Sequence, residues 1–182
     1  MQEVRDRKLG FRLMFQDEAR FGRISDPRAC WVPIEIGRPV SAKQIIREYT
    51  YAYGAVSPQD GHFDSLILPT MDAGAMSVFL KEIFKRYPSE YILMIADGAS
   101  CHKSKDLVIP NNIKLLPLPP YSPILNPQEN IWDEMREKWF GNCVFRDMDA
   151  VEERMISALL ALEKDHQLVK SITGWDWILN AL

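Results

Sequence analysis

The feature that most constrains the fold is an apolar run, YILMIA at 91–96, which stops at Asp97 and Gly98. An uninterrupted apolar run of this length is typical of a strand whose two faces are both covered. Such strands occur mainly where helices pack on both sides of a sheet. We therefore predict that 91–96 is a strand of an α/β protein.

The rest of the chain supplies strands and helices in an order that fits this layout. Further strands are predicted at 11–16, 47–56, 62–68 and 113–119, and the turn SPQDG joins the second and third as a hairpin. Apolar residues at helical spacing predict helices at 73–87, 127–140 and 148–164, and shorter ones near 166–171 and 174–181. This order predicts an α/β fold with a mixed central sheet flanked by helices.

Composition and charge argue against several classes of protein. The 182 residues suffice for one domain with a core, and no apolar run approaches the roughly 20 residues of a membrane span. The N-terminus has no apolar signal core, and three scattered cysteines argue against a disulfide framework, so we expect a cytoplasmic protein. The net charge of −3 speaks mildly against a self-sufficient nucleic-acid binder.

Two acidic residues follow apolar strands. We expect the first strand to end at Asp17, with Glu18 as the competing carboxylate, and the strand 91–96 to end at Asp97. The carboxyl ends of parallel strands are where α/β proteins collect functional groups. The structural alternative is that Asp17 starts a turn and that Asp97 caps a following helix.

A third acid lies in the proline-rich stretch LPPYSPILNPQENIW at 118–132. Asn126 is a good N-cap and Pro127 a favoured first helical residue, so Glu129 fits a capping box that returns to the Asn126 backbone. Alternatively, Glu129 lies at the rim of the helix's apolar stripe and points along the core boundary towards the strand ends. A loop stiffened by prolines suits a carboxylate that must be held in place.

Three carboxylates brought together repel one another and raise one another's pKa values. Divalent cations relieve that repulsion, and oxygen ligands without cysteine or histidine clusters favour magnesium or manganese. Two such ions, about 3.5–4 Å apart, can activate an attacking oxygen and stabilise the leaving oxygen of a phosphodiester. The joint pattern therefore indicates metal-dependent phosphodiester chemistry.

Three stretches, DEARFGR, ADGASCHKS and above all LPPYSPILNPQENIW, resemble the catalytic domain of mariner-type DDE transposases, a superfamily that includes many bacterial insertion-sequence transposases. The resemblance runs from about residue 9 to 140 and implies an RNase H-like fold. It also implies that Asp17, Asp97 and Glu129 are the catalytic, metal-binding triad. We expect a single catalytic domain over 1–182, with a helical extension at about 145–182 and without the N-terminal helix-turn-helix region of full-length relatives.

The resemblance also implies a reaction and partners. Two Mg²⁺ or Mn²⁺ ions would serve hydrolysis at transposon ends and transfer of the freed 3′-hydroxyl to target DNA at a TA dinucleotide. The implied assembly is a homodimer or larger, acting at the bacterial nucleoid and not at a membrane. Candidate nucleic-acid contacts are His102, Lys103, Lys105 and Arg136, with His102 also next to the metal ligands.

Two alternatives remain open. The chain could be an RNase H-like nuclease that cuts DNA without joining it. It could also be an inactive, truncated transposase that only binds DNA or dimerises.

Overall fold

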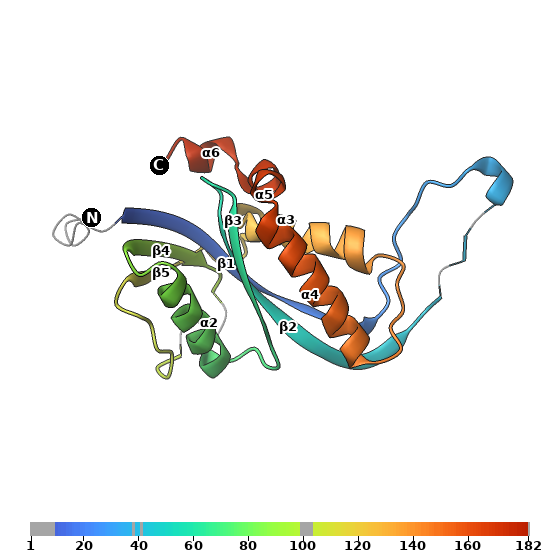
Figure 1. Ribbon diagram of the computed structural model, residues 1–182, viewed down its shortest axis with the longest axis horizontal. Helices are drawn as coiled ribbons and strands as arrows, with labels where there is room; N and C mark the ends of the chain where they lie inside the picture. The colour runs from blue at the N-terminus through green and yellow to red at the C-terminus, as the bar shows by residue number, and fades with distance from the viewer. Residues whose placement is uncertain (1–9, 38, 41, 99–103, 182) are drawn as a thin grey trace.

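The computed structural model describes residues 10–37, 39–40, 42–98 and 104–181, which fold around one mixed sheet (Figure 1). The strand order is β3-β2-β1-β4-β5. The strands are β1 (Gly10–Ile24), β2 (Ile45–Ser57), β3 (His62–Leu68), β4 (Glu90–Ala96) and β5 (Ile113–Pro117). β1, β2 and β3 are antiparallel neighbours, whereas β4 and β5 run parallel to β1. The predicted mixed α/β sheet is confirmed.

The two longest helices of the described chain begin at capping aspartates. The carboxylate of Asp72 accepts the Ala75 N–H at the start of α2 (Ala73–Arg86), and Asp147 accepts the Ala150 N–H at the start of α4 (Met148–Lys164), both at 2.9 Å. The remaining helices are α3 (Gln128–Met135), which continues as a π-helical turn over Arg136–Phe140, then α5 (His166–Thr173) and α6 (Asp176–Leu179). Short 3₁₀ turns occur at Ile34–Ile36 (η1) and Pro123–Leu125 (η3). In the described residues, no helix is both long and apolar enough to cross a bilayer.

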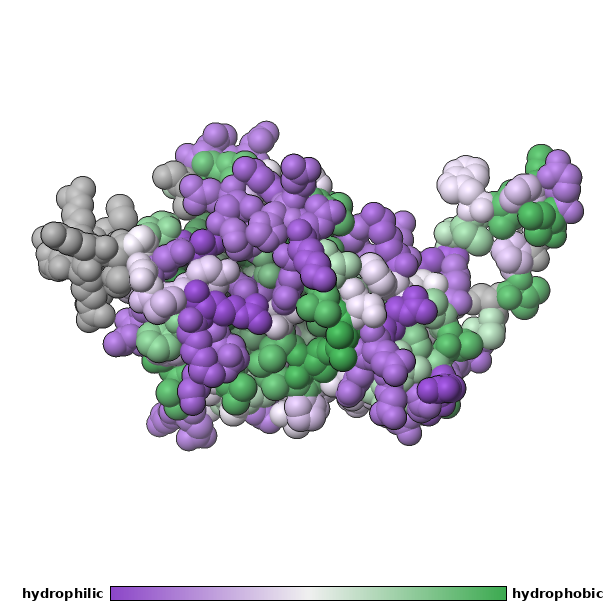
Figure 2. Space-filling model, in the orientation of Figure 1, coloured by the Kyte–Doolittle hydropathy of each residue, from purple (hydrophilic) through white to green (hydrophobic). Residues whose placement is uncertain are grey.

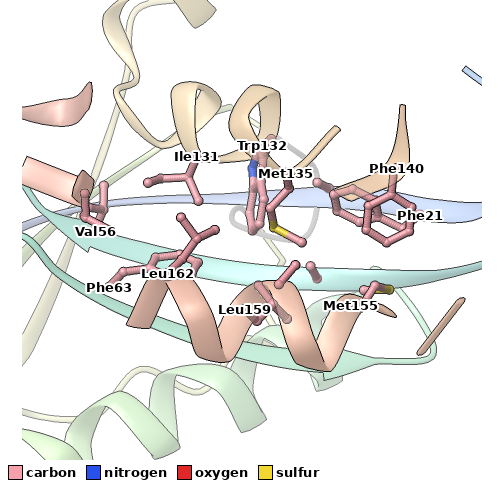
Figure 3. Close-up of a cluster of buried hydrophobic side chains, with 14 of the residues drawn as sticks. Phe21, Val56, Phe63, Ile131, Trp132, Met135, Phe140, Met155, Leu159 and Leu162 are labelled. Carbon is pink, nitrogen blue, oxygen red and sulfur yellow. The ribbon is translucent and has the colours of Figure 1, made fainter. Parts of the chain in front are cut away.

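Strand alternation sends β1 side chains into two separate cores. Leu13, Phe15 and Phe21 belong to the larger core, which lies between the sheet and helices α3, α4 and α5. Figure 3 shows part of this cluster, with side chains from α3, such as Trp132, meeting those of α4, such as Leu159. Met14 belongs to the smaller core under α2. Helices therefore cover the sheet on both faces.

β1 is longer than predicted. The sequence suggested that the strand ends at Asp17, and that prediction is wrong, because β1 continues to Ile24. Its antiparallel pairing with β2 runs from Phe15 opposite Val56 to Ile24 opposite Ile45, so the partner strand extends the ladder. On its other side β1 pairs with β4 only as far as Phe15 opposite Ile95. Asp17 therefore lies inside a strand, just past the point where β1 loses its parallel neighbour.

Part of the connection between β1 and β2, the described residues 29–37, 39–40 and 42–43, extends away from the body of the molecule (Figure 1). We call this segment the arm. Apolar side chains on it, among them Trp31, Ile34 and Val40, are almost fully exposed. Figure 2 shows these hydrophobic groups standing clear of the body.

Candidate active site

The pleat of the sheet places Asp17 and Asp97 on the same face. Phe15 and Ile95 are opposite each other in the parallel pair β1–β4, and each acid lies two residues further along its own strand direction. Residues two apart point to the same side of a sheet, and neighbouring strands are about 4.8 Å apart. Both acids consequently lie on the face that carries the larger core. Asp17 is buried, at 9% exposure, while Asp97 is exposed.

Glu18, the competing carboxylate, follows the opposite alternation. It faces Tyr53 across the β1–β2 ladder, and Tyr53 packs in the core under α2. The side chain of Glu18 therefore starts from the face opposite to Asp17, and the cavity described below is lined by Asp17 and not by Glu18.

Glu129 is brought to the same place by the start of α3. The side-chain oxygen of Asn126 accepts the Gln128 N–H at 3.1 Å, and the Asn126 N–H donates to the Pro123 carbonyl at 2.8 Å. The Asn126 side chain therefore bonds the first residue of α3, but the N-cap lies one residue later than predicted, at Pro127, which makes no side-chain cap. The Asn126 N–H, which a capping box would offer to Glu129, is instead donated within the proline-rich loop. The half-buried Glu129 lies beside this turn.

The three acids line one cavity of about 670 Å³. Its remaining wall consists of Gly98, the loop 117–123 and Asn126. The structure therefore brings the three predicted site residues, which are far apart in the sequence, to a shared opening at the carboxyl end of β4. Within the described part of the chain, no three His, Cys, Asp or Glu side chains are placed closely enough to hold a metal ion.

Burial and mutual repulsion raise the pKa values of two of the three acids. Burial first, and then the charges of Glu129, Glu18 and Asp97, raise the pKa of Asp17 to about 8. Burial also raises the pKa of Glu129, against the opposing effect of the Arg136 charge and together with the charges of Asp133 and Asp97. The site thus concentrates negative charge that is unfavourable without a cation or a proton.

A tryptophan contacts the most buried acid. The indole Nε1–H of Trp132, on α3, donates to Oδ2 of Asp17 at 3.0 Å. The sequence analysis did not predict this contact, because Trp132 falls among the apolar residues of the helix predicted at 127–140. The available signal was chemical, because a buried indole N–H usually finds an acceptor.

The two candidate nucleic-acid contacts that the structure describes, Lys105 and Arg136, lie outside the cavity lining. Lys105 is exposed in the segment before β5. Arg136 lies at the end of α3, 3.7 Å from Asp133 and with its guanidinium 5.8 Å from the centre of the Phe21 ring. His102 and Lys103 fall outside the described residues.

Comparison with known proteins gives three findings. The family described as "DDE superfamily endonuclease" matches residues 12–152. The protein y4pE/y4sA of Sinorhizobium fredii (strain NBRC 101917 / NGR234), itself named as uncharacterized, is 36% identical over 130 residues, which cover 71% of this chain and 96% of that protein. Among solved structures, the Mos1 strand transfer complex matches with a TM-score of 0.58 at 17% identity, covering 89% of this chain and 50% of the Mos1 chain.

Other Mos1 structures match this chain to a similar extent. The pre-cleavage Mos1 transpososome matches with a TM-score of 0.58 at 14% identity, over 99% of this chain and 58% of that one. The mariner Mos1 paired-end complex with Mn matches with a TM-score of 0.56 at 16% identity, over 93% and 55% of the two chains. The present chain thus spans about half the length of the Mos1 chains. The likeness establishes the expected RNase H-like fold.

Proposed function

This chain belongs to the DDE superfamily endonucleases, and we propose that it is the catalytic domain of a mariner-type transposase, which cuts and joins DNA strands at transposon ends. The observation that carries the proposal is the convergence of Asp17, Asp97 and Glu129 on one cavity. The likeness to Mos1 complexes with transposon ends supports the choice of DNA as substrate.

The chemistry of the three side chains fits a hard divalent cation. Carboxylate oxygens are the ligands that Mg²⁺ and Mn²⁺ prefer, and the raised pKa values of Asp17 and Glu129 reflect a charge excess that a cation would relieve. The Mos1 complexes with Mn and with Mg support the same choice. When bound, a pair of such ions activates the attacking oxygen and stabilises the leaving oxygen of the phosphodiester.

The chain's own residues have distinct roles in this proposal. Asp17 and Asp97, on adjacent strands of a rigid sheet, would share the ions, and Glu129 would hold one of them from the start of α3. The proline-rich loop keeps Glu129 at the mouth of the cavity. Lys105 and Arg136 would neutralise DNA phosphates near the site, and His102 and Lys103 remain candidates for the same task. The target would be a TA dinucleotide.

We further propose that the chain works as a homodimer or larger assembly at the bacterial nucleoid. The arm supports this, because it exposes apolar side chains, including Trp31, Ile34, Ile36 and Val40, that its own body does not cover. Exposed apolar groups gathered on one segment mark surfaces that pack against a partner. Residues 1–182 would form one catalytic domain, since α4 and α5 contribute to the same core as β1.

Mn²⁺ titration of the full chain by calorimetry tests the site. The proposal predicts that the wild type binds Mn²⁺ and that Asp97→Ala loses most of this affinity, whereas Glu134→Gln, whose side chain pairs with Lys138 and does not line the cavity, retains it. Equal binding by the wild type and Asp97→Ala would support an inactive protein that only dimerises or binds DNA.

A strand-joining assay tests the reaction. Incubation with Mn²⁺ and DNA that carries the chain's own transposon ends should give joined product. Nicked DNA without joined product would favour the RNase H-like nuclease.

A further inference from the structure

We propose that Trp132 is a positioning residue that holds the Asp17 carboxylate in its working orientation. The inference rests on the proposed function, because it takes Asp17 as a metal ligand. The indole Nε1–H donates to Asp17 Oδ2 at 3.0 Å across 115 positions of sequence, and Trp132 is 0% exposed. The contact joins α3, which carries Glu129, directly to the strand that carries Asp17.

The indole of Trp132 packs against the strand position that pairs with Asp17. Gly54 stands directly opposite Asp17 in the β1–β2 ladder. A Cβ atom at Gly54 would lie 2.7 Å from Cη2 of Trp132, and 2.6 Å and 2.8 Å from side-chain atoms of Gln128 and Phe63. Any side chain there would push the indole away from the sheet. The glycine therefore opens the space through which α3 reaches Asp17.

Aromatic contacts fix the ring within this seat. Phe21 and Phe63 each pack edge-on against Trp132 with ring centroids 6.2 Å away (Figure 3). The N–H is thus aimed by a ring that has no room to turn. A donor held so rigidly restricts rotation of the Asp17 carboxylate. Groups hydrogen-bonded to metal ligands typically orient them in this way.

The competing explanation is that Trp132 only fills the core and that Asp17 merely satisfies a buried N–H. Two substitutions separate these roles. Trp132→Phe keeps an aromatic ring and removes the donor. Phe145→Leu loosens the same core at a ring that packs against Phe140, and it keeps the indole donor and its two edge-on neighbours, so it is the matched control.

The test is Mn²⁺ affinity, measured by calorimetry on the full chain. Positioning predicts that Trp132→Phe binds Mn²⁺ about ten- to a hundredfold more weakly than the wild type, while Phe145→Leu stays near the wild-type value. Equal losses in the two variants, or none in Trp132→Phe, overturn the inference. A wild type that binds no Mn²⁺ would instead contradict the proposed function.

A second measurement needs neither metal nor the Trp132 substitution. In the metal-free protein labelled with ¹⁵N-tryptophan, Asp17→Ala removes the acceptor, so one indole N–H resonance should move upfield. Asp17→Asn keeps an acceptor oxygen and should move that resonance less. The inference fails if Asp17→Ala leaves every indole resonance unmoved.

Discussion

The side-chain amide of Asn126 donates a buried hydrogen bond of 3.0 Å to the backbone carbonyl of Gln16, 110 positions away. Gln16 immediately precedes Asp17, and the Asn126 side chain also accepts the N–H of Gln128, the first residue of the helix that carries Glu129. One residue of the proline-rich loop therefore ties the helical acid to the strand acid. This contact gives the stiff loop a structural purpose, because prolines hold Asn126 where both of its hydrogen bonds can form.

Asn126→Ala should lower the free energy of unfolding by about 1–3 kcal/mol, because the Gln16 carbonyl loses its side-chain donor and the Gln128 N–H loses its side-chain acceptor. Chemical denaturation measures this loss. Mn²⁺ affinity should fall as well, since Glu129 is no longer held relative to Asp17. Asn130→Ala is the control, because Asn130 donates to the Ile172 carbonyl of α5 and does not contact the cavity. Asn126→Ala with unchanged Mn²⁺ affinity would contradict the linking role.

Asp17 should make the metal-free protein less stable as the pH rises. Its pKa is about 8 in the folded protein against an ordinary value of 3.8, so the folded state keeps a proton that the unfolded chain releases. The stability from this group is fully present below pH 3.8 and is lost as the pH rises to about 8.

Asp17→Asn is neutral at every pH and should escape this loss. The difference in unfolding free energy between Asp17→Asn and the wild type should grow between pH 5 and 8, by at most about 1.4 kcal/mol per pH unit. Denaturant titrations in EDTA measure it. Stability curves that run parallel across this range would show that Asp17 titrates normally.

Divalent ions should stabilise the folded chain through the three acids. A ligand at a hundred times its dissociation constant adds about 2.7 kcal/mol to the free energy of unfolding. We expect a stabilisation of this size from Mn²⁺ in the wild type, and its loss in Glu129→Gln. Thermal unfolding with and without Mn²⁺ measures the effect. Glu134→Gln, which removes only an ion pair with Lys138 on the same helix, should respond like the wild type.

The arm should contribute to self-association and not to folding. Trp31 and Ile34 are almost fully exposed, so replacing both by serine should change the free energy of unfolding by less than about 0.5 kcal/mol. The same double substitution should weaken self-association, as measured by sedimentation velocity. Val108→Ser changes an exposed apolar residue away from the arm and is the control. An unchanged association constant would remove the arm from the interface.

The C-terminal helices should unfold together with the sheet if the chain is one domain. Gly61, in the turn between β2 and β3, has a φ of +75°, and a Cβ there would lie 2.1 Å from the His166 carbonyl oxygen of α5. Gly61→Ala should therefore lower the free energy of unfolding by about 2 kcal/mol or more, and the whole chain should still unfold in one transition. Gly37→Ala shares the positive φ, at +73°, but meets nothing within 4 Å, so it isolates the clash from the backbone strain. Two separate transitions in Gly61→Ala would argue for two domains.

The sequence by itself determined the element types and the candidate acids. The run YILMIA has no polar face, which is typical of a strand covered on both sides, and it forms β4. Alternation along β1 sends Leu13 and Phe15 to one core and Met14 to the other, because side-chain direction in a strand follows from position alone. The proline-rich motif likewise identified the start of α3, since its cap and prolines act locally.

Only the tertiary structure decided how these parts meet. β1 passes Asp17 because β2 continues the ladder beyond it, and no local signal reports the length of a partner strand. The Trp132–Asp17 and Asn126–Gln16 contacts likewise join segments more than a hundred positions apart. Local preferences fix the conformation of a segment, but a site built from distant residues depends on how sheet pairing and helix packing bring their backbones together.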